Sequence, residues 1–276
     1  MSIGYLNGKI INPGDPVLPI DERGHQFGDG VYEYIRVYGG RAFMMKEHME
    51  RFFKSAEAIK LNLSHTPEEI QAIVDDLIER SGLSDCDVYM QATRGIAPRN
   101  HLFPNVPASI SMTVKPFRAM DETLREQGAK VKLLPDERWQ NCWIKTLNLL
   151  PNLLAKQEAF EAGAFEAVLV RDGIVTEGSS SNIFLVKDGT LVTPPATKHI
   201  LHGITRIAVL DIAAELGISV EEKEFAPEAV FEAEEVFLTS TGIEIVPVTS
   251  ADDQVIGSGK PGAVTKKIYE AFMKRV

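Results

Sequence analysis

A lysine among apolar neighbours is the first candidate for chemistry in this sequence. Lys145 lies in the segment Ile144-Lys145-Thr146-Leu147. Burial of a lysine lowers the pKa of its amine, and a neutral amine can form a Schiff base with a carbonyl compound. Taken alone, the segment is more typical of a strand lysine that points to water. Lys145 therefore needs support from other residues.

Three further segments are rich in groups that bind polar ligands. Residues 176–182 read Thr-Glu-Gly-Ser-Ser-Ser-Asn, which suits either a solvated loop or a loop that closes on a ligand. Gly203 leads directly into a helical pattern, and the N–H groups at a helix N-terminus favour a phosphate, although many helices begin this way without a ligand. Thr239-Ser240-Thr241-Gly242 offers hydroxyl groups for the same phosphate, or forms a plain turn.

The first half of the chain contributes basic residues. Residues 23–33 are dense in glycine, which is typical of a turn-rich loop that leads into a strand. Arg51 lies in an expected helix and is by default a surface arginine. Arg99 and His101 stand two residues apart on an expected loop, where they either bind a carboxylate or face solvent.

Hydrophobic periodicity predicts the elements that must position these residues. Alternation predicts strands over residues 31–38, 42–45, 88–93, 109–114, 131–134, 167–170, 174–175, 182–186, 190–192, 236–239 and 244–248. Helical spacing and end signals predict helices over 46–61, 67–81, 150–162 and 205–216 and from about 261 onward. Thr66-Pro67-Glu68-Glu69 is a capping box, and Asp172-Gly173 and Asp188-Gly189 are hairpin turns. Hairpin-linked strands indicate an α+β fold, not a doubly wound nucleotide fold.

Bulk composition narrows the class of protein. The 276 residues carry a formal net charge of −10, which argues against nucleic acid or an anionic membrane as the main partner. Cys86 and Cys142 are too few for a disulfide framework and lack metal-site spacing. We find no signal-peptide pattern and no apolar run of membrane-spanning length, so a soluble cytoplasmic protein is expected.

A polar, weakly periodic stretch divides the chain. We expect residues 1–117 to form an N-terminal domain, residues 118–128 to be a linker and residues 129–276 to form a C-terminal domain. A chain of this length is long enough to give each domain a core of its own.

The motifs together resemble those of a known family. Four pieces match the fold-type IV pyridoxal-phosphate enzymes in order, and most closely the D-amino acid aminotransferases. They are Phe27-Gly28-Asp29-Gly30-Val31-Tyr32-Glu33, Ile144-Lys145-Thr146-Leu147-Asn148, Thr176-Glu177-Gly178-Ser179-Ser180-Ser181-Asn182 and Gly203-Ile204-Thr205-Arg206. The resemblance runs over essentially the whole chain. It implies a two-domain α+β fold, with a smaller N-terminal α/β sandwich and a larger C-terminal pseudo-barrel that carries most of the cofactor site.

The resemblance also implies a role for each matched residue. Lys145 forms the Schiff base with pyridoxal 5′-phosphate and moves a proton between the substrate α-carbon and the cofactor C4′. Glu177 pairs with the pyridine nitrogen, which keeps the ring able to accept electrons. The phosphate is held by Arg51, Ile204, Thr205 and Thr241. Ser180 and Ser240 add hydrogen bonds around the cofactor, and Leu201 packs against the ring.

Substrate binding depends on a separate set of residues. In the D-specific family an Arg-x-His pair and a tyrosine form a carboxylate trap, which Arg99, His101 and Tyr32 match. The Arg-x-His pair comes from the partner subunit there, so the resemblance implies a homodimer. Two positions depart from the pattern: Arg36 resembles the Glu-x-x-Arg stretch of branched-chain aminotransferases, and Gly242 stands where a hydroxyl residue is expected.

The predicted function is therefore ping-pong transamination of D-amino acids. D-Alanine and 2-oxoglutarate are the typical substrates, with pyruvate and D-glutamate as products. The alternatives are a branched-chain L-amino acid aminotransferase, a lyase of the aminodeoxychorismate type, an amine transaminase and a non-catalytic carrier of the cofactor. The Arg99-x-His101 pair favours transamination of D-amino acids over the branched-chain alternative, because it fits the D-specific trap. A full carboxylate trap would have no purpose in a non-catalytic carrier.

Overall fold

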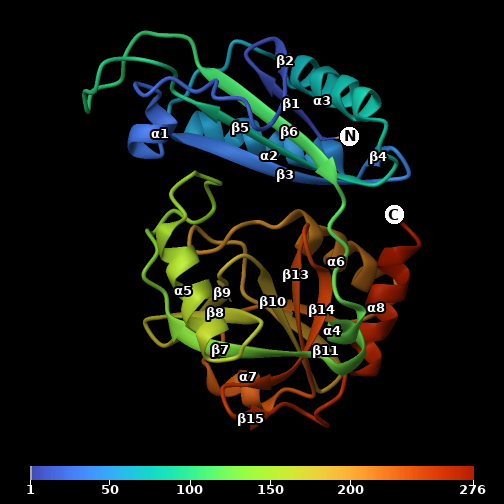
Figure 1. Ribbon diagram of the computed structural model, residues 1–276. Helices are drawn as coiled ribbons and strands as arrows, with labels where there is room; N and C mark the ends of the chain where they lie inside the picture. Colours follow the sequence, from blue (N-terminus) through green and yellow to red (C-terminus); the bar gives the residue numbers. More distant parts are fainter. Residues whose placement is uncertain (1) are drawn as a thin grey trace. The chain divides into compact units, whose positions relative to one another are not determined.

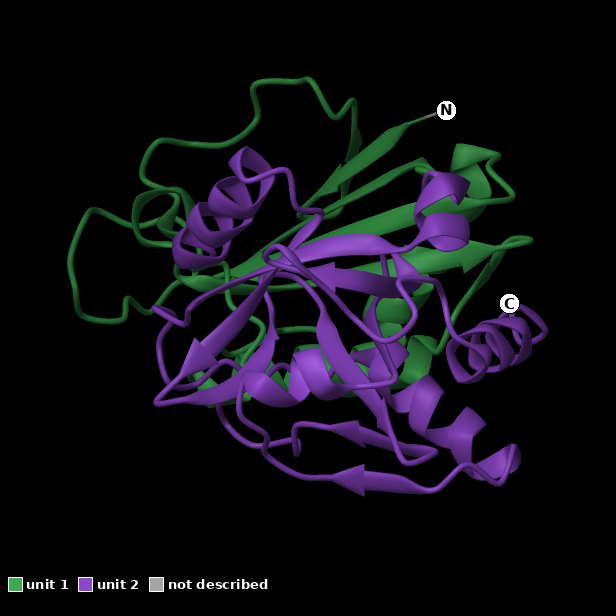
Figure 2. Cartoon of the chain, turned by 90° about the horizontal axis from the view of Figure 1, so that it is seen from below, with its two compact units in different colours: residues 1–118, 144–148 green, residues 119–143, 149–276 purple. Residues whose placement is uncertain are grey.

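The computed structural model describes residues 2–276, and the chain divides into two compact units (Figures 1 and 2). Unit 1 comprises the residues up to Arg118 together with Ile144–Asn148. Unit 2 comprises Ala119–Trp143 and Leu149–Val276. The segment that carries Lys145 therefore belongs with unit 1, although the chain on both sides of it belongs to unit 2. Nothing in the sequence pattern indicated this return.

Unit 1 is built on an antiparallel sheet of six strands with the order β2-β1-β6-β5-β3-β4. Its strands are β1 (Ile3–Leu6), β2 (Lys9–Ile11), β3 (Gly30–Tyr38), β4 (Arg41–Ala42), β5 (Cys86–Thr93) and β6 (Ser109–Pro116). Its helices are α1 (Arg23–Phe27), α2 (Met45–Ala58) and α3 (Pro67–Ser81). The buried side chains of α2 and α3, including Phe52 and Leu77, share one apolar core with those of the central strands, including Ile35 and Met90.

Unit 2 is built on a mixed sheet with the order β12-β11-β10-β13-β14-β7-β8-β9, in which β15 also pairs with β14. Its strands are β7 (Ala129–Pro135), β8 (Glu166–Arg171), β9 (Ile174–Gly178), β10 (Asn182–Lys187), β11 (Thr190–Thr193), β12 (Val220–Glu222), β13 (Glu235–Ser240), β14 (Glu244–Ala251) and β15 (Gln254–Val255). Its helices are α4 (Glu122–Gln127), α5 (Leu150–Glu161), α6 (Ile204–Glu215), α7 (Glu228–Glu232) and α8 (Ala263–Met273).

The connection between β9 and β10 shapes the sheet of unit 2. β9 is the edge strand, and β10 lies near the opposite edge, yet only residues 179–181 join them. The sheet must therefore curl back on itself, as a half-barrel does, and its strands share a buried apolar core that includes Val168, Ile183 and Leu238. This observation confirms the predicted α+β class and the curled C-terminal sheet.

Predictions that depend on a few neighbouring residues are confirmed. Asp172 and Gly173 both have positive φ values (52° and 78°), as do Asp188 and Gly189 (49° and 69°), which is the conformation that a two-residue hairpin turn requires. The capping box of α3 is present, with the Thr66 hydroxyl accepting from the N–H of Glu69.

Three expectations differ from the structure. The strand predicted over 42–45 is wrong beyond Ala42, because Met45 already begins α2. The glycine-rich stretch contains the short helix α1, which ends at Gly28 in the left-handed conformation. The stretch expected as a linker contains α4, whose N-cap is Asp121. Within residues 2–276, no helix combines the length and apolarity needed to cross a membrane.

Candidate active site

In unit 1, the lysine segment is attached to the start of β3. Thr146 forms a β-bridge with Val31, and the backbone N–H of Tyr32 donates to the carbonyl of Lys145 at 3.0 Å. The hydroxyl of Ser55, on α2, accepts from the N–H of Lys145 at 3.2 Å. These contacts place the Lys145 amine 4.2 Å from the centre of the Tyr32 ring. The structure thus brings together two residues that the sequence singled out separately.

The residue after Tyr32 is a fully buried carboxylate, Glu33. Arg51 binds it through both Nε and Nη2, each at 2.7 Å, and Nδ1 of His48 lies 2.7 Å from Oε2. Burial opposes ionisation, but Arg51 and His48 outweigh it and hold the pKa of Glu33 well below its ordinary value. Burial also lowers the pKa of His48, so the neutral ring donates from Nδ1 to Glu33. One edge of the Arg51 guanidinium is thus used by Glu33, and the predicted phosphate contact stays a prediction for the other edge.

Arg99 and His101 meet on a single aromatic ring. The Arg99 guanidinium lies 4.1 Å from the centre of the Phe27 ring, and the His101 ring lies 5.7 Å from it. Both side chains are exposed. In residues 2–276, Arg99 forms no ion pair, and its guanidinium donates to the carbonyl of Gln26 at 3.3 Å. The described residues also show no hydrogen bond or ring contact between this pair and Tyr32.

Two buried arginines hold the loop that carries Arg99 and His101. Arg23 and Arg94 both pair with Asp29, at 2.8 and 2.9 Å. Arg23 also donates to the carbonyl of Asn100, which fixes the loop between Arg99 and His101. The ion pairs thus hold the base of the loop while its tip remains exposed.

Arg36, the first departure from the D-specific pattern, has a structural partner. Its Nε donates to Asp87 at 2.6 Å, and its guanidinium covers the Phe117 ring at 4.0 Å. The side chain is only 3% exposed. Arg36 is therefore committed to the interior of unit 1 and is not available to bind a substrate carboxylate.

In unit 2, Glu177 is buried on β9 and surrounded by donors. Arg138 donates from Nη1 to Oε1 at 2.5 Å, Asn182 donates to Oε2 at 2.8 Å, and the N–H of Leu201 lies 3.0 Å from both oxygens. Burial raises the pKa of Glu177, and the Arg138 charge and the Leu201 N–H only partly offset this effect. Because the Leu201 N–H contacts both oxygens, each oxygen of Glu177 already takes part in two hydrogen bonds.

The serine-rich loop is organised by a second buried carboxylate. Glu166 accepts from the hydroxyls of Ser179, Ser180 and Ser181, at 2.5, 2.9 and 3.3 Å. The hydroxyl of Ser180 is thus used within unit 2, and its hydrogen bond to the cofactor stays a prediction.

The N-terminus of α6 differs from that of α3. Its N-cap is Gly203, with no side-chain cap, and both Ile204 and Thr205 are buried. Ser240 ends β13, and Thr241 and Gly242 follow in the turn to β14. The neighbouring Thr239 hydroxyl is buried without a hydrogen-bond partner among the described residues. Uncapped N–H groups and an unsatisfied hydroxyl are what an anionic group needs.

Comparison with known proteins agrees with this geometry. Residues 30–251 match the family described as amino-transferase class IV. A D-alanine aminotransferase of Bacillus licheniformis is 43% identical over 98% of this chain and 96% of its own length. The chain belongs to the class IV aminotransferases. Among solved structures, the branched-chain amino acid aminotransferase of Escherichia coli superimposes with a TM-score of 0.93 at 30% identity, covering 99% of this chain and 93% of that one.

A class IV aminotransferase uses pyridoxal phosphate, and its substrates are amino acids and 2-oxo acids. The T.th. branched-chain amino acid aminotransferase, solved with pyridoxamine 5′-phosphate, has a TM-score of 0.92 and 29% identity to this chain, with 99% and 93% coverage. The residues here fit such a cofactor. Glu177 is a buried carboxylate of the kind that can pair with a protonated ring nitrogen, and α6 presents N–H groups without a side-chain cap for a phosphate.

Several residues of this aminotransferase were not given a role from the sequence. Arg138 contacts Glu177, Glu33 binds Arg51, and Phe27 supports Arg99. Glu33 and Phe27 were inside a quoted motif without a role. For Arg138, the only local sign was an arginine two residues after an aspartate, as in Asp136-x-Arg138.

Proposed function

We propose that this chain transfers the amino group of D-amino acids to 2-oxo acids, with D-alanine and 2-oxoglutarate as the typical pair. The observation that carries the proposal is the state of Arg99. Its guanidinium is exposed, lies beside His101 on the Phe27 ring and has no carboxylate partner within residues 2–276. Two cationic or hydrogen-bonding groups held together in this way suit the carboxylate of an amino acid.

The resemblance to the family suggests roles for the chain's other residues. Bound pyridoxal phosphate would supply an electron sink for the substrate α-carbon. Lys145 would anchor the cofactor and carry the proton at the substrate α-carbon. Glu177 would accept from the ring nitrogen, and Arg51, Ile204, Thr205 and Thr241 would hold the phosphate. Ser180, Ser240 and Leu201 would complete the surroundings of the cofactor.

Branched-chain L-amino acids are the second candidate class of substrate. The high structural similarity to the E. coli branched-chain enzyme favours it. The burial of Arg36 against Asp87 disfavours it, because the residue that resembled the branched-chain pattern is used inside unit 1. The greater identity to a D-alanine aminotransferase points the same way.

Half-reactions separate the two classes. We expect D-alanine to convert the bound cofactor rapidly to its amine form, as seen in the visible spectrum, and L-leucine and phenylethylamine to do so slowly. Rapid conversion by L-leucine with no response to D-alanine would overturn the proposal. Lys145→Ala must lose the absorbance of a lysine-bound cofactor, and retention of that band would remove Lys145 from its role.

A homodimer is part of the proposal. Large apolar residues on one side of α5 are exposed: Leu150 (67%), Leu153 (62%), Leu154 (59%) and Phe160 (72%). Such a stripe on a helix suits a second copy of this chain. We expect Leu153→Glu to shift the protein from dimer to monomer in sedimentation, whereas a charge reversal at the exposed Glu79 of α3, Glu79→Lys, should leave the dimer intact.

Complementation tests whether Arg99 acts in the partner's site. Lys145→Ala and Arg99→Ala homodimers should each be nearly inactive with D-alanine. After they are mixed and allowed to exchange subunits, about a quarter of wild-type activity should return, because half of the dimers are mixed and each has one site without a defect. No recovery, with exchange verified by a tagged subunit, would place Arg99 in the site of its own chain.

A further inference from the structure

A series of side chains of alternating charge extends from Glu177 within unit 2. Arg138 binds Glu177 with Nη1 and binds Asp136 with Nε and Nη2, both at 2.9 Å. Asp136 in turn forms an ion pair with Arg171 at 3.0 Å and accepts from the Thr176 hydroxyl at 2.9 Å. Starting from Glu177, the contacts therefore run from carboxylate to guanidinium to carboxylate to guanidinium.

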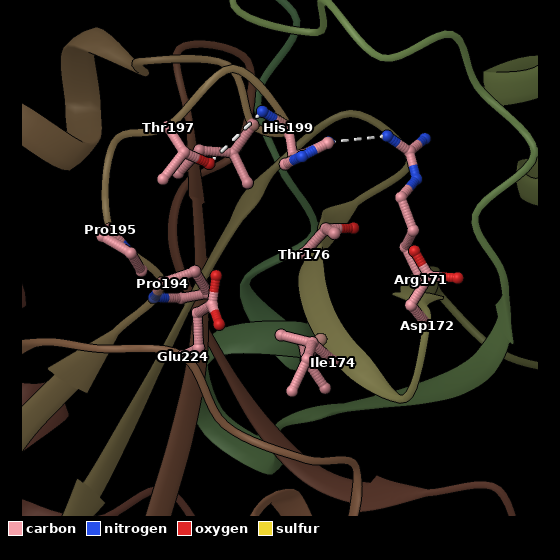
Figure 3. A pocket seen from close by; sticks show the side chains of 11 residues that line it. Arg171, Asp172, Ile174, Thr176, Pro194, Pro195, Thr197, His199 and Glu224 are labelled. Carbon is pink, nitrogen blue, oxygen red and sulfur yellow. Dashed lines mark hydrogen bonds between the residues drawn. The ribbon is translucent and has the colours of Figure 1, made fainter.

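Arg171, the outermost member of this series, lines a cavity. Arg171 and His199 lie on one wall of a cavity of about 230 Å³ and are joined by a hydrogen bond of 3.0 Å (Figure 3). Arg171 also donates to the carbonyl of Arg138 at 2.8 Å, so it holds the backbone of that residue as well as the side chain of Asp136. Side-chain exposure is 4% at Glu177, 7% at Arg138, 0% at Asp136 and 14% at Arg171, so the outer end of the series is its most exposed member.

Each member has an electrostatic reason for its place. Burial opposes the ionisation of Asp136, but hydrogen bonds and charge from Arg138 and Arg171 outweigh it and lower its pKa. Desolvation opposes the charge of Arg138, yet Asp136 and Glu177 raise its pKa. Burial raises the pKa of the nearby Cys142 thiol, which therefore stays neutral and leaves the balance unchanged.

Arg138 is shared between two carboxylates, so its effect on each depends on the other. The bidentate fork to Asp136 fixes the plane of the guanidinium and directs Nη1 at Glu177. Removing the Asp136 charge leaves the positive charge of Arg138 to act on Glu177 alone. Removing the Arg171 charge leaves two carboxylates with one guanidinium, and the surroundings of Glu177 become more negative.

We propose that Asp136 and Arg171 are positioning residues whose opposite charges, relayed through Arg138, set how strongly Glu177 holds a proton on the ring nitrogen of the cofactor. The inference rests on the proposed role of Glu177. It distinguishes a charge relay from simple packing, because loss of the two residues must act in opposite directions.

The test measures the ring nitrogen directly. Pyridoxal phosphate labelled with ¹⁵N at the ring is bound to the wild-type chain, and its ¹⁵N chemical shift is followed as a function of pH. We expect Asp136→Asn to lower the midpoint of nitrogen deprotonation and Arg171→Gln to raise it, each by on the order of one pH unit, the effect of a unit charge about 12 Å from the nitrogen at an effective dielectric constant near 20.

A matched control separates charge from loss of stability. Glu235 is another half-buried carboxylate of unit 2, where it accepts from the N–H groups of Val264 and Thr265 at the start of α8. Glu235→Gln should lower the free energy of unfolding without moving the nitrogen midpoint. Shifts of the same sign in Asp136→Asn and Arg171→Gln, or no shift in either, would overturn the relay.

Glu177→Gln distinguishes the inference from the proposal beneath it. This variant should lower the midpoint by more than Asp136→Asn does. If Glu177→Gln leaves the nitrogen unaffected, the role of Glu177 in the proposed function is wrong, and the relay fails with it. If Glu177→Gln has its expected effect and the other two variants do not, only the relay fails.

Discussion

Each unit buries a glutamate against an arginine, and the two pairs differ in how the arginine is used. In unit 1, Glu33 accepts from both nitrogens of one edge of Arg51, from His48 and from the N–H of Tyr34. In unit 2, Glu177 accepts from one nitrogen of Arg138, and Asp136 accepts from two other nitrogens of the same guanidinium. The pKa of Glu33 is lowered and the pKa of Glu177 is raised. Burial alone therefore does not determine the ionisation state of a carboxylate. A carboxylate bound by a whole edge of an arginine is strongly stabilised in its charged form, and a carboxylate that shares its arginine with a second one is not.

The largest expected effect is on the pair in unit 1. Glu33→Gln removes the negative charge beside Arg51 and puts an amide donor in place of one acceptor oxygen, and we expect the free energy of unfolding of the cofactor-free protein to fall by about 3–5 kcal/mol, as when one partner of a buried ion pair is removed. Glu177→Gln should cost less, because Arg138 keeps Asp136. Urea unfolding of both variants measures the difference. Equal losses would show that the two glutamates have the same structural weight.

The same two glutamates should respond to pH in opposite directions. The folded-state pKa of Glu33 lies below its ordinary value of 4.5, so its stabilisation is present above that pH and is lost as the pH falls further. The folded-state pKa of Glu177 lies above 4.5, so its contribution is present at lower pH and is lost as the pH rises. Relative to wild type, Glu33→Gln should be less damaging at about pH 4 than at about pH 7, and Glu177→Gln should be more damaging at the lower pH. Unfolding curves of the cofactor-free proteins at both values check this, and parallel behaviour of the variants would contradict it.

A smaller effect on the free energy of unfolding is expected from displacing Asn182, which donates to Glu177. A Cβ at Gly203 would overlap Oδ1 of Asn182, whose amide donates to Glu177 and to the carbonyl of Leu201. Gly203→Ala should therefore displace Asn182 and lower the free energy of unfolding by about 1–3 kcal/mol. Gly14→Ala, where an added Cβ meets nothing within 4 Å, is the control. A Gly203→Ala protein as stable as the control would show that Asn182 moves without loss.

The smallest effect concerns the exposed arginine of unit 1. Phe27→Leu removes the ring beneath Arg99, and we expect KM for D-alanine to rise by about two- to fivefold, corresponding to about 0.5–1 kcal/mol of cation–π interaction. Phe117→Leu removes the ring beneath Arg36, which is buried and paired with Asp87. It should affect thermal unfolding and leave KM unchanged. Steady-state kinetics of both variants make the comparison, and a similar rise in KM for each would argue against a specific role for Phe27.

The predictability of these features from sequence follows the range of the interactions. The capping box at Thr66 and the two Asp-Gly turns were predicted because neighbouring residues determine them. The partners of Glu33 and Glu177 were not predicted. Arg51 is 18 residues from Glu33, and Arg138 is 39 residues from Glu177, so each pair depends on how whole elements pack. The motif resemblance named Lys145 and Glu177, but it did not say which partners set their properties.

The attachment of Ile144–Asn148 to unit 1 has a practical consequence for dissecting the protein. The chain passes between the units at three points, after residues 118, 143 and 148. A single cut therefore cannot yield two fragments that each keep all of their own contacts. A fragment that begins at Ala119 carries Lys145 but lacks β3, to whose first residues the lysine segment is bound. A fragment that ends at Arg118 keeps β3 but lacks the lysine. Mixing the two fragments would show directly whether Ile144–Asn148 can pair with β3 again without a covalent link between the fragments.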